Sequence, residues 1–550
     1  MNLAGQRYVP LEWHFISTVS YDDPFNDVDV DVKVEDATGR SWMIPAFWQG
    51  GNTWTVRFSA PKEGSYTYKS ICTSPTDAGL HDQTGQIEIS AYSGTNPLYV
   101  HGPIQIMQNQ RYFEYADGTP FPWLGDTWHP LMTSRINNSD EVELLAKDRE
   151  EKGYTFIEFI NGFLCDITLW DKRLSNEAGF AWTKDLKSIN PEYYNICEPK
   201  IKTITDHGIV LGINGAWGFY IKLLGLEKMK KHFRYMIARW AAYPVIWILA
   251  GETTYVSYDL NTLPDDDPKV IQWAAEANTM WSEVLRYLKE TDPFHRMVTT
   301  HTMHGKLASE ELNKSDLLDF DAFQCGIHDE NYDLVGNEVK SCCIRARQNK
   351  PIKPYVNEET CYEQMLYRCG PNVQRWIFWH SMLGGCAGWT YGACGLFDMS
   401  HEEDPFGTSV YGVNWGECSW QEAYQFEGGK EVSRCRKYLN KYEWWKLQPA
   451  QDKVVNADGI DAWQECVAAE IPGKVLISYF YPHVSLMTMY RIQGTTFRNL
   501  KPGDRYQIFV YNPIRDYEKD LGEATVTEEG LLFTPKPWTA NDWVYVAEKI

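Results

Sequence analysis

Between residues 121 and 389 the sequence holds eight short apolar runs of strand character, separated mostly by stretches long enough for a helix. Regular alternation of strands and helices is typical of parallel sheets, and eight such units predict a (β/α)8 TIM barrel of the α/β class. The predicted strands are Phe121–Gly125, Thr155–Ile160, Ile209–Ile213, Val245–Leu249, Met297–Thr300, Ala322–Gln324, Pro354–Val356 and Ala387–Trp389.

The stretches between these runs carry helix signals. Asp140 and Glu143 make a capping-box start to a helix that we expect to end near Gly153. A second helix is indicated by four apolar residues that recur at helical spacing and stop before a proline: Met229, Phe233, Ile237 and Trp240.

On both sides of this region the sequence is rich in strands. Four valines from Val28 to Val34 alternate with charged residues, which predicts a half-buried strand. Near the other end, residues 475–481 and 506–511 are equally strand-like. We therefore predict three domains: an N-terminal Ig-like β-sandwich at 1–100, a catalytic barrel at 101–450, and a C-terminal β-sandwich at 451–550.

The composition narrows the class of ligand. The net charge is -22 without a basic run, which disfavours nucleic acid and anionic membranes as partners. Aromatic residues make up 14% of the chain and suit the faces of sugars, although large β-domains also use them. The 13 cysteines are scattered and no signal peptide stands at the start, so a cytoplasmic location is expected. No phosphate-binding glycine loop follows a strand, and no cofactor is indicated.

The residues just after each predicted strand are mostly polar or aromatic. In a barrel these positions surround the active site, because the carboxyl ends of all eight strands meet at one face. The candidates for substrate binding are Asp126, Trp128, Asn161, His301, Gln324, His328, Trp389 and Tyr391. Glu158 can instead be a buried structural partner, and aromatic rings at a barrel rim often serve packing alone.

Two of these positions carry the acidic pair that glycoside hydrolysis needs. Glu252 follows the fourth strand and Glu359 the seventh. One carboxyl group must stay protonated to donate to the leaving oxygen, and the other attacks the anomeric carbon or activates water. Carboxyl groups about 5–5.5 Å apart indicate retention, and about 6.5–9.5 Å indicates inversion. Alternation along the strand favours Glu359 over Glu358, which is expected to point toward helices or solvent.

Several segments resemble the apiosidase-like barrels of glycoside hydrolase family 140. They are residues 121–128, 245–252, 323–328, 353–363 and 388–392. The resemblance spans the whole chain, including both sandwiches, and implies a clan of retaining hydrolases with Glu252 as acid/base and Glu359 as nucleophile. The chain has Gly251 where most of the clan has Asn, and Glu252 where family 140 can carry Asp, so the sugar stays open.

The prediction is thus a retaining glycoside hydrolase that cleaves a terminal bond of an oligosaccharide or glycoside. A transglycosylase with the same residues, a non-catalytic carbohydrate-binding protein and, less well supported, a uronic-acid lyase are alternatives. His301 and His304 are the nearest approach to a metal motif, but catalytic zinc wants three ligands, so no metal is expected. Self-association as a homo-oligomer is left open.

Overall fold

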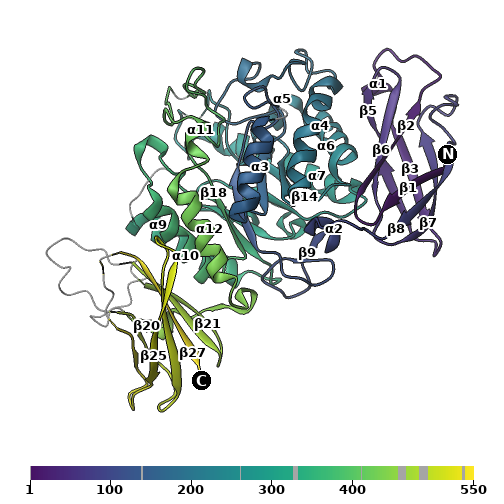
Figure 1. The fold of residues 1–550 in the computed structure, drawn as a ribbon. Coiled ribbons are helices and arrows are strands. Elements are labelled where there is room, and N and C mark those ends of the chain that lie inside the picture. The colour runs from purple at the N-terminus through teal and green to yellow at the C-terminus, as the bar shows by residue number, and fades with distance from the viewer. Residues whose placement is uncertain are drawn as a thin grey trace.

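The computed structural model describes residues 2–137, 140–260, 262–325, 332–410, 412–455, 466–481, 494–535, 539 and 541–550. A central barrel carries one β-domain near each terminus, on opposite sides of it (Figure 1). Within the described residues no helix is long and apolar enough to cross a membrane. All thirteen cysteines are free thiols.

The eight barrel strands are parallel neighbours in one sheet, which confirms the predicted fold class. They are β11 (Trp123–Thr127), β12 (Phe156–Ile160), β13 (Val210–Asn214), β14 (Val245–Gly251), β15 (Val298–His301), β16 (Asp321–Gln324), β17 (Tyr355–Glu359) and β18 (Gly388–Tyr391). The sheet order runs from β15 round to β16. At this last seam the Thr299 hydroxyl donates to the Phe320 carbonyl over 3.1 Å, so the barrel is nearly closed.

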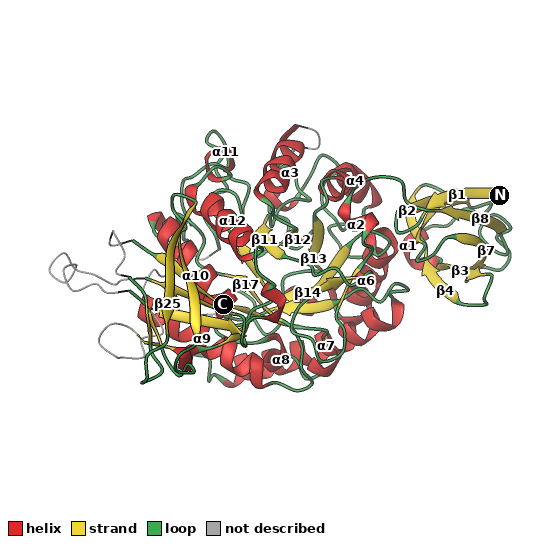
Figure 2. Cartoon of the chain, turned by 60° about the horizontal axis from the view of Figure 1, so that its bottom comes forward, coloured by secondary structure: helices red, strands yellow, loops and turns green. Residues whose placement is uncertain are grey.

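Helices surround the barrel strands, as Figure 2 shows. The longer ones are α3 (Asp140–Lys152), α4 (Pro191–Asp206), α6 (Leu226–Trp240), α7 (Pro268–Thr291), α9 (Tyr332–Gln348), α10 (Pro371–Leu383) and α12 (Glu427–Leu439). The short ones are α1 (Pro24–Asp27), α2 (Pro97–Val100), α5 (Tyr220–Leu224), α8 (Ala308–Glu311) and α11 (Trp420–Ala423). Both predicted helices are present as α3 and α6, and all four apolar residues named for α6 are buried.

The N-terminal domain stacks a five-stranded sheet on a three-stranded one. Its strands are β1 (Asn2–Gln6), β2 (Pro10–Ile16), β3 (Val30–Asp36), β4 (Ser41–Pro45), β5 (Phe47–Gly50), β6 (Thr53–Ser59), β7 (Gly64–Cys72) and β8 (Thr84–Ser90). The alternating valines of β3 are buried in the core between the sheets. Arg57 of β6 ties this domain to the barrel, because it pairs with Glu198 at 2.9 Å and donates to the Arg239 carbonyl.

A short hairpin of β9 (Ile104–Gln105) and β10 (Glu114–Tyr115) leads into the barrel. After the barrel come β19 (Gln448–Pro449), β20 (Val454–Val455), β21 (Cys466–Ile471), β22 (Val475–Phe480), β23 (Thr496–Phe497), β24 (Arg505–Asn512), β25 (Tyr517–Thr525), β26 (Leu532–Phe533) and β27 (Trp543–Lys549). They form a six-stranded and a three-stranded sheet. Arg375 of α10 binds Asp542 through two hydrogen bonds of 2.7 and 2.8 Å and thereby fixes this domain to the barrel.

Candidate active site

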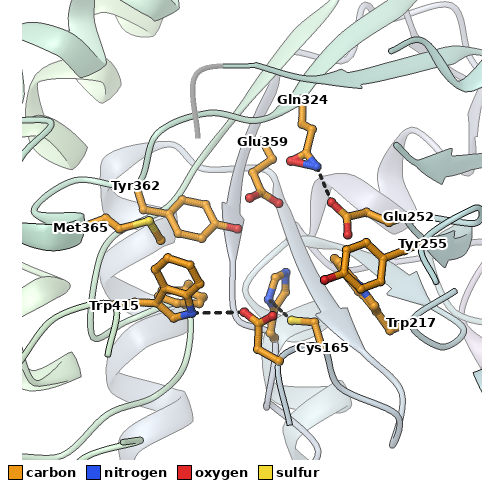
Figure 3. Close-up of a pocket in the computed structure, with 12 residues that line it drawn as sticks. Cys165, Trp217, Glu252, Tyr255, Gln324, Glu359, Tyr362, Met365 and Trp415 are labelled. Atoms are coloured by element: carbon orange, nitrogen blue, oxygen red, sulfur yellow. Dashed lines mark hydrogen bonds between the residues drawn. The ribbon is translucent and has the colours of Figure 1, made fainter. Parts of the chain in front are cut away.

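A pocket opens at the carboxyl ends of the barrel strands and contains both predicted acidic residues (Figure 3). The loops after the strands supply most of its wall, as expected for a barrel of this kind. The lining residues are His129, Cys165, Asp166, Trp217, Glu252, Tyr255, Gln324, Glu359, Tyr362, Met365, Phe397 and Trp415. Three of them are carboxylates, five are aromatic besides the histidine, and none is lysine or arginine.

The backbone conformation and backbone hydrogen bonds of Glu252 fix its position directly after β14. Its φ of 49° lies in the left-handed region, which non-glycine residues seldom adopt and which recurs at functional sites. The backbone N–H of Glu252 donates to the His301 carbonyl over 2.9 Å, and its own carbonyl accepts from the N–H of Tyr255. The preceding Gly251 has no room for a side chain, because a Cβ there would lie 2.0 Å from the Trp217 ring.

Glu359 reaches the pocket through an irregularity in the sheet. The pairing of β16 with β17 shifts register between Phe323 and Gln324, and Gln324 then lies opposite Glu359. A shift of this kind re-aims the side chains that follow it. The Glu359 carboxylate lies 2.9 Å from Nε2 of His301, and both side chains are buried.

The two carboxyl groups differ in their electrostatic surroundings. Burial raises the pKa of Glu252 to about 8, and the nearby charge of Glu359 acts in the same direction. Burial also acts to raise the pKa of Glu359, but the hydrogen bond and positive charge of His301 outweigh it and leave that pKa lowered. The pKa of His301 is correspondingly raised well above 6.5, because its acidic neighbours outweigh its burial. At neutral pH, Glu252 is therefore protonated and Glu359 ionised.

Glu358 differs from the prediction that it would face helices or solvent. It is the side chains of Tyr355 and Asn357 that point to α10, where they bond to the Gly384 carbonyl and the Ser381 hydroxyl. Glu358 faces the barrel interior, and its carboxyl group lies 3.8 Å from Nδ1 of His301. The alternation argument chose the wrong face, and Glu359 lines the pocket only because the register shift interrupts the alternation.

Glu158, His301 and Glu358 form a buried cluster whose donor atoms all lie within 4.8 Å of one another. Such a set can take a divalent cation, or it can stay neutral by protonation, since burial raises the pKa of Glu358 to about 7. None of the three lines the pocket. That no metal takes part in the reaction stays a prediction.

Two of the predicted substrate-binding residues stand at the pocket. Gln324 lines it and donates from Nε2 to the Glu252 carboxyl over 2.9 Å. His301 lies directly behind Glu359. His328, the third residue predicted on this side of the barrel, lies outside the described residues.

Five other predicted residues lie away from the pocket. Asp126 pairs with Arg149 of α3 at 2.6 Å and also accepts from the indole of Trp128, and all three side chains are buried. The remaining three point toward the helices and do not line the pocket: Asn161 bonds to His232 of α6, Trp389 packs edge-on against Phe378 of α10, and Tyr391 donates to Glu363. Trp128 and Asn161 follow their strands as predicted, whereas Asp126 lies within β11, and Trp389 and Tyr391 lie within β18. None of the five side chains lines the pocket.

The lining also contains residues that sequence reasoning did not select. His129 and Trp217 follow the first and third strands, and strand-end position could have marked them. Burial lowers the pKa of His129 to about 4, so its ring is neutral beside the pocket. Asp166 and Trp415 come from long loops, and no pattern in the sequence marks them.

Comparison with known families agrees with this geometry. Residues 107–446, more than half of the chain, match the family "Apiosidase-like, catalytic domain". The chain belongs to this apiosidase-like family. Its barrel is thus a glycoside hydrolase-like catalytic domain, and residues 5–73 in front of it match a domain of unknown function, DUF5060. No curated protein matches the sequence significantly.

Solved structures share the fold of this apiosidase-like protein. A candidate glycoside hydrolase from Bacteroides vulgatus is 15% identical with a TM-score of 0.68, and the match covers both chains completely. A glycoside hydrolase family 5 structure from the same organism is 17% identical with a TM-score of 0.65, over 83% of this chain and 95% of the other. A further structure named glycoside hydrolase is 18% identical with a TM-score of 0.64, over 83% and 98%. At these identities the likeness concerns the fold.

Proposed function

We propose that this apiosidase-like protein is a retaining glycosidase that removes a terminal sugar from an oligosaccharide or glycoside. The observation that carries the proposal is the pair of pocket carboxyl groups whose pKa values are driven apart, that of Glu252 to about 8 and that of Glu359 downward. A protonated carboxyl group can serve as the acid of such a reaction, and an ionised one in the same pocket can serve as its nucleophile.

In the first step the ionised Glu359 attacks the anomeric carbon while Glu252 gives its proton to the leaving oxygen. In the second step Glu252 takes a proton from water, and the resulting nucleophile releases the sugar from Glu359. His301 lies 2.9 Å from the Glu359 carboxylate and favours its ionised form before the attack. The aromatic lining supplies faces on which a sugar ring can stack.

Terminal cleavage is supported by how the pocket is bounded. Tyr255 and Trp415 stand at its edges on loops from opposite parts of the barrel, as Figure 3 shows. A pocket with side chains standing on two sides suits a chain end, whereas an internal bond needs an open groove. The carboxylate pair favours hydrolysis over sugar binding alone, because binding does not require two carboxyl groups with opposite protonation.

Site-directed variants test the two roles. Glu252→Ala should lower kcat/KM on a glycoside with a poor leaving group by about 10²–10⁴-fold, with azide restoring turnover of an activated aryl glycoside. Glu359→Ala should lower kcat/KM at least as much, and azide should not restore formation of a product with the retained anomeric configuration. Glu403→Ala, on an exposed loop, is the matched control and should behave as wild type.

Product analysis tests the stereochemistry. Proton NMR of the first product formed from an aryl glycoside should show the anomer of the substrate. An inverted first product, or near-wild-type activity of Glu359→Ala, contradicts the proposal. Release of single sugars from the end of an oligosaccharide, followed by chromatography, tests terminal action in the same experiment.

A further inference from the structure

Asp166 is a third carboxylate in the pocket, and the proposed double displacement gives it no part. It lies in the connection between β12 and α4, and its side chain lines the pocket together with Glu252 and Glu359. Its backbone φ of 61° lies in the left-handed region, which aspartate adopts more readily than most other non-glycine residues.

Two contacts with the connection between β18 and α11 hold Asp166 in place. Its carbonyl accepts from the N–H of Val410 over 2.9 Å, and its Oδ2 accepts from the Trp415 indole over 3.1 Å. The Trp415 carbonyl in turn accepts from the N–H of Leu366. Figure 3 shows Trp415, which makes this bond, on the side of the pocket away from Glu252. The Asp166 carboxylate is thus fixed in the wall of the pocket.

The charge of this wall limits what can bind. Burial raises the pKa of Asp166 to about 6, the Trp415 hydrogen bond acts against this, and the charge of Glu359 adds to it. Arg173 is the cation that acts on Asp166, but it is engaged by Asp171 and does not line the pocket. Above about pH 6 the Asp166 carboxylate is therefore an anionic acceptor, and none of the described lining residues is a lysine or arginine that could receive an anionic substrate.

We propose that Asp166 is a specificity-determining residue that accepts hydrogen bonds from hydroxyl groups of the terminal sugar and excludes sugars that carry a carboxylate or sulfate. The inference rests on the proposed glycosidase function and adds the substrate class, a neutral glycone. An ionised acceptor fits a hydroxyl donor well, and a like charge placed beside it is repelled. Trp415 keeps one oxygen occupied, which leaves the other for the sugar.

The test is a cycle between one substitution and one missing hydroxyl group. Asp166→Asn keeps the size of the side chain and an oxygen that can accept from Trp415, but it removes the charge. On the neutral 4-nitrophenyl glycoside that the wild type hydrolyses best, we expect kcat/KM to fall about 10- to 100-fold. The wild type should lose a similar factor on one monodeoxy analogue of that glycoside, and Asp166→Asn should lose much less on the same analogue.

The matching 4-nitrophenyl uronide supplies the second readout. The wild type should discriminate against it above pH 6, and Asp166→Asn should narrow the ratio between neutral glycoside and uronide at least tenfold. A variant that had only lost structure would lower both rates together. Asp185→Asn, an exposed aspartate in the same connection, is the control and should match wild type.

The outcomes separate two failures. The role of Asp166 is overturned if the loss of kcat/KM caused by Asp166→Asn and the loss caused by each monodeoxy analogue simply add, and if the ratio of rates on neutral glycoside and uronide stays unchanged. This outcome would leave the catalytic pair intact. Activity that survives in Glu359→Ala, or a wild type that hydrolyses no glycoside of the panel, counts instead against the proposed function.

Discussion

At the scale of single residues, the chemistry of the pocket depends on the proton that Glu252 keeps. Its pKa of about 8 results first from burial, so ionisation of this group should set the alkaline limit of activity. Gln324 works against burial, because its Nε2 donates to the Glu252 carboxyl and stabilises the ionised form. A second bond from the same nitrogen to the Thr302 carbonyl, 2.7 Å long, fixes the direction of the amide.

Replacing Gln324 by leucine should therefore raise the pKa of Glu252 further. We expect the alkaline limb of the kcat/KM profile to move to higher pH, with a lower maximum because a sugar contact is lost as well. The measurement is kcat/KM of one aryl glycoside from pH 5 to 10 for wild type and Gln324→Leu. A limb that moves to lower pH, or stays fixed while Glu252→Ala abolishes it, contradicts this account of the pKa.

At the scale of elements, the sequence was sufficient for the barrel but not for the direction of its side chains. All eight predicted strands are present, since buried parallel strands are continuous apolar runs that stand out between amphipathic helices. Whether a residue at a strand end faces the pocket or the helices depends on local register. The shift beside Gln324 turns Glu359 inward, and no pattern in the sequence marks that shift.

Loops explain the rest of what could not be predicted. Asp166 and Trp415 form a hydrogen bond in the wall of the pocket although they lie 249 positions apart in the sequence, because the barrel brings their loops together. Asp126, in contrast, has the strand position of a pocket residue, but its carboxylate forms an ion pair with Arg149 of α3 and does not line the pocket. Position at a strand end predicts which part of the chain surrounds a site. Which side chains line the pocket depends on where each buried polar group finds its hydrogen-bond partners.

The packing around α12 and α10 gives a prediction at this scale. Arg436 of α12 is buried, none of its guanidinium nitrogens has a hydrogen-bond partner among the described residues, and burial lowers its pKa to about 9. It lies 4.2 Å from the Trp444 ring. An unpartnered buried polar group lowers the free energy of unfolding by about 1–3 kcal/mol, and the cation–π contact with the ring offsets up to about 2 kcal/mol of this loss. Arg436→Met should thus raise the free energy of unfolding by about 1 kcal/mol.

Arg375 of α10 is the matched control, because it is equally buried but paired with Asp542 and Glu431. Arg375→Met strands two carboxylates and should lower the free energy of unfolding by about 3–5 kcal/mol. Urea titrations of both variants measure the difference. A loss of more than about 2 kcal/mol in Arg436→Met would mean that its guanidinium is paired after all.

At the scale of the whole molecule, several buried acids make stability depend on pH in one direction. Burial raises the pKa of Glu252 to about 8 and those of Glu358, Glu363 and Asp398 to about 7. When the pKa of an acid is higher in the folded state, the folded state holds the proton longer. Its stability is therefore fully present below the unfolded pKa and is lost as pH rises through the folded pKa. Acids with lowered pKa, such as Asp77 at about 2, act only below this range.

We therefore expect the free energy of unfolding, and with it Tm, to fall steadily between pH 5 and pH 8. Each unit by which folding raises the pKa of an acid contributes about 1.4 kcal/mol to the fall in free energy. Self-repulsion from the net charge of -22 acts in the same direction, but it is a surface effect that salt screens. Scanning calorimetry with and without about 0.5 M NaCl separates the two causes, because this salt shortens the Debye length to roughly a few ångströms. The decline should persist in salt and be shallower in Glu358→Gln, which keeps the shape of the buried group and cannot ionise. If salt removed the decline, or if Tm rose toward pH 8, the acids in the barrel would have to be ionised and paired, and the protonated state of Glu252 on which the proposed chemistry depends would lose its physical basis.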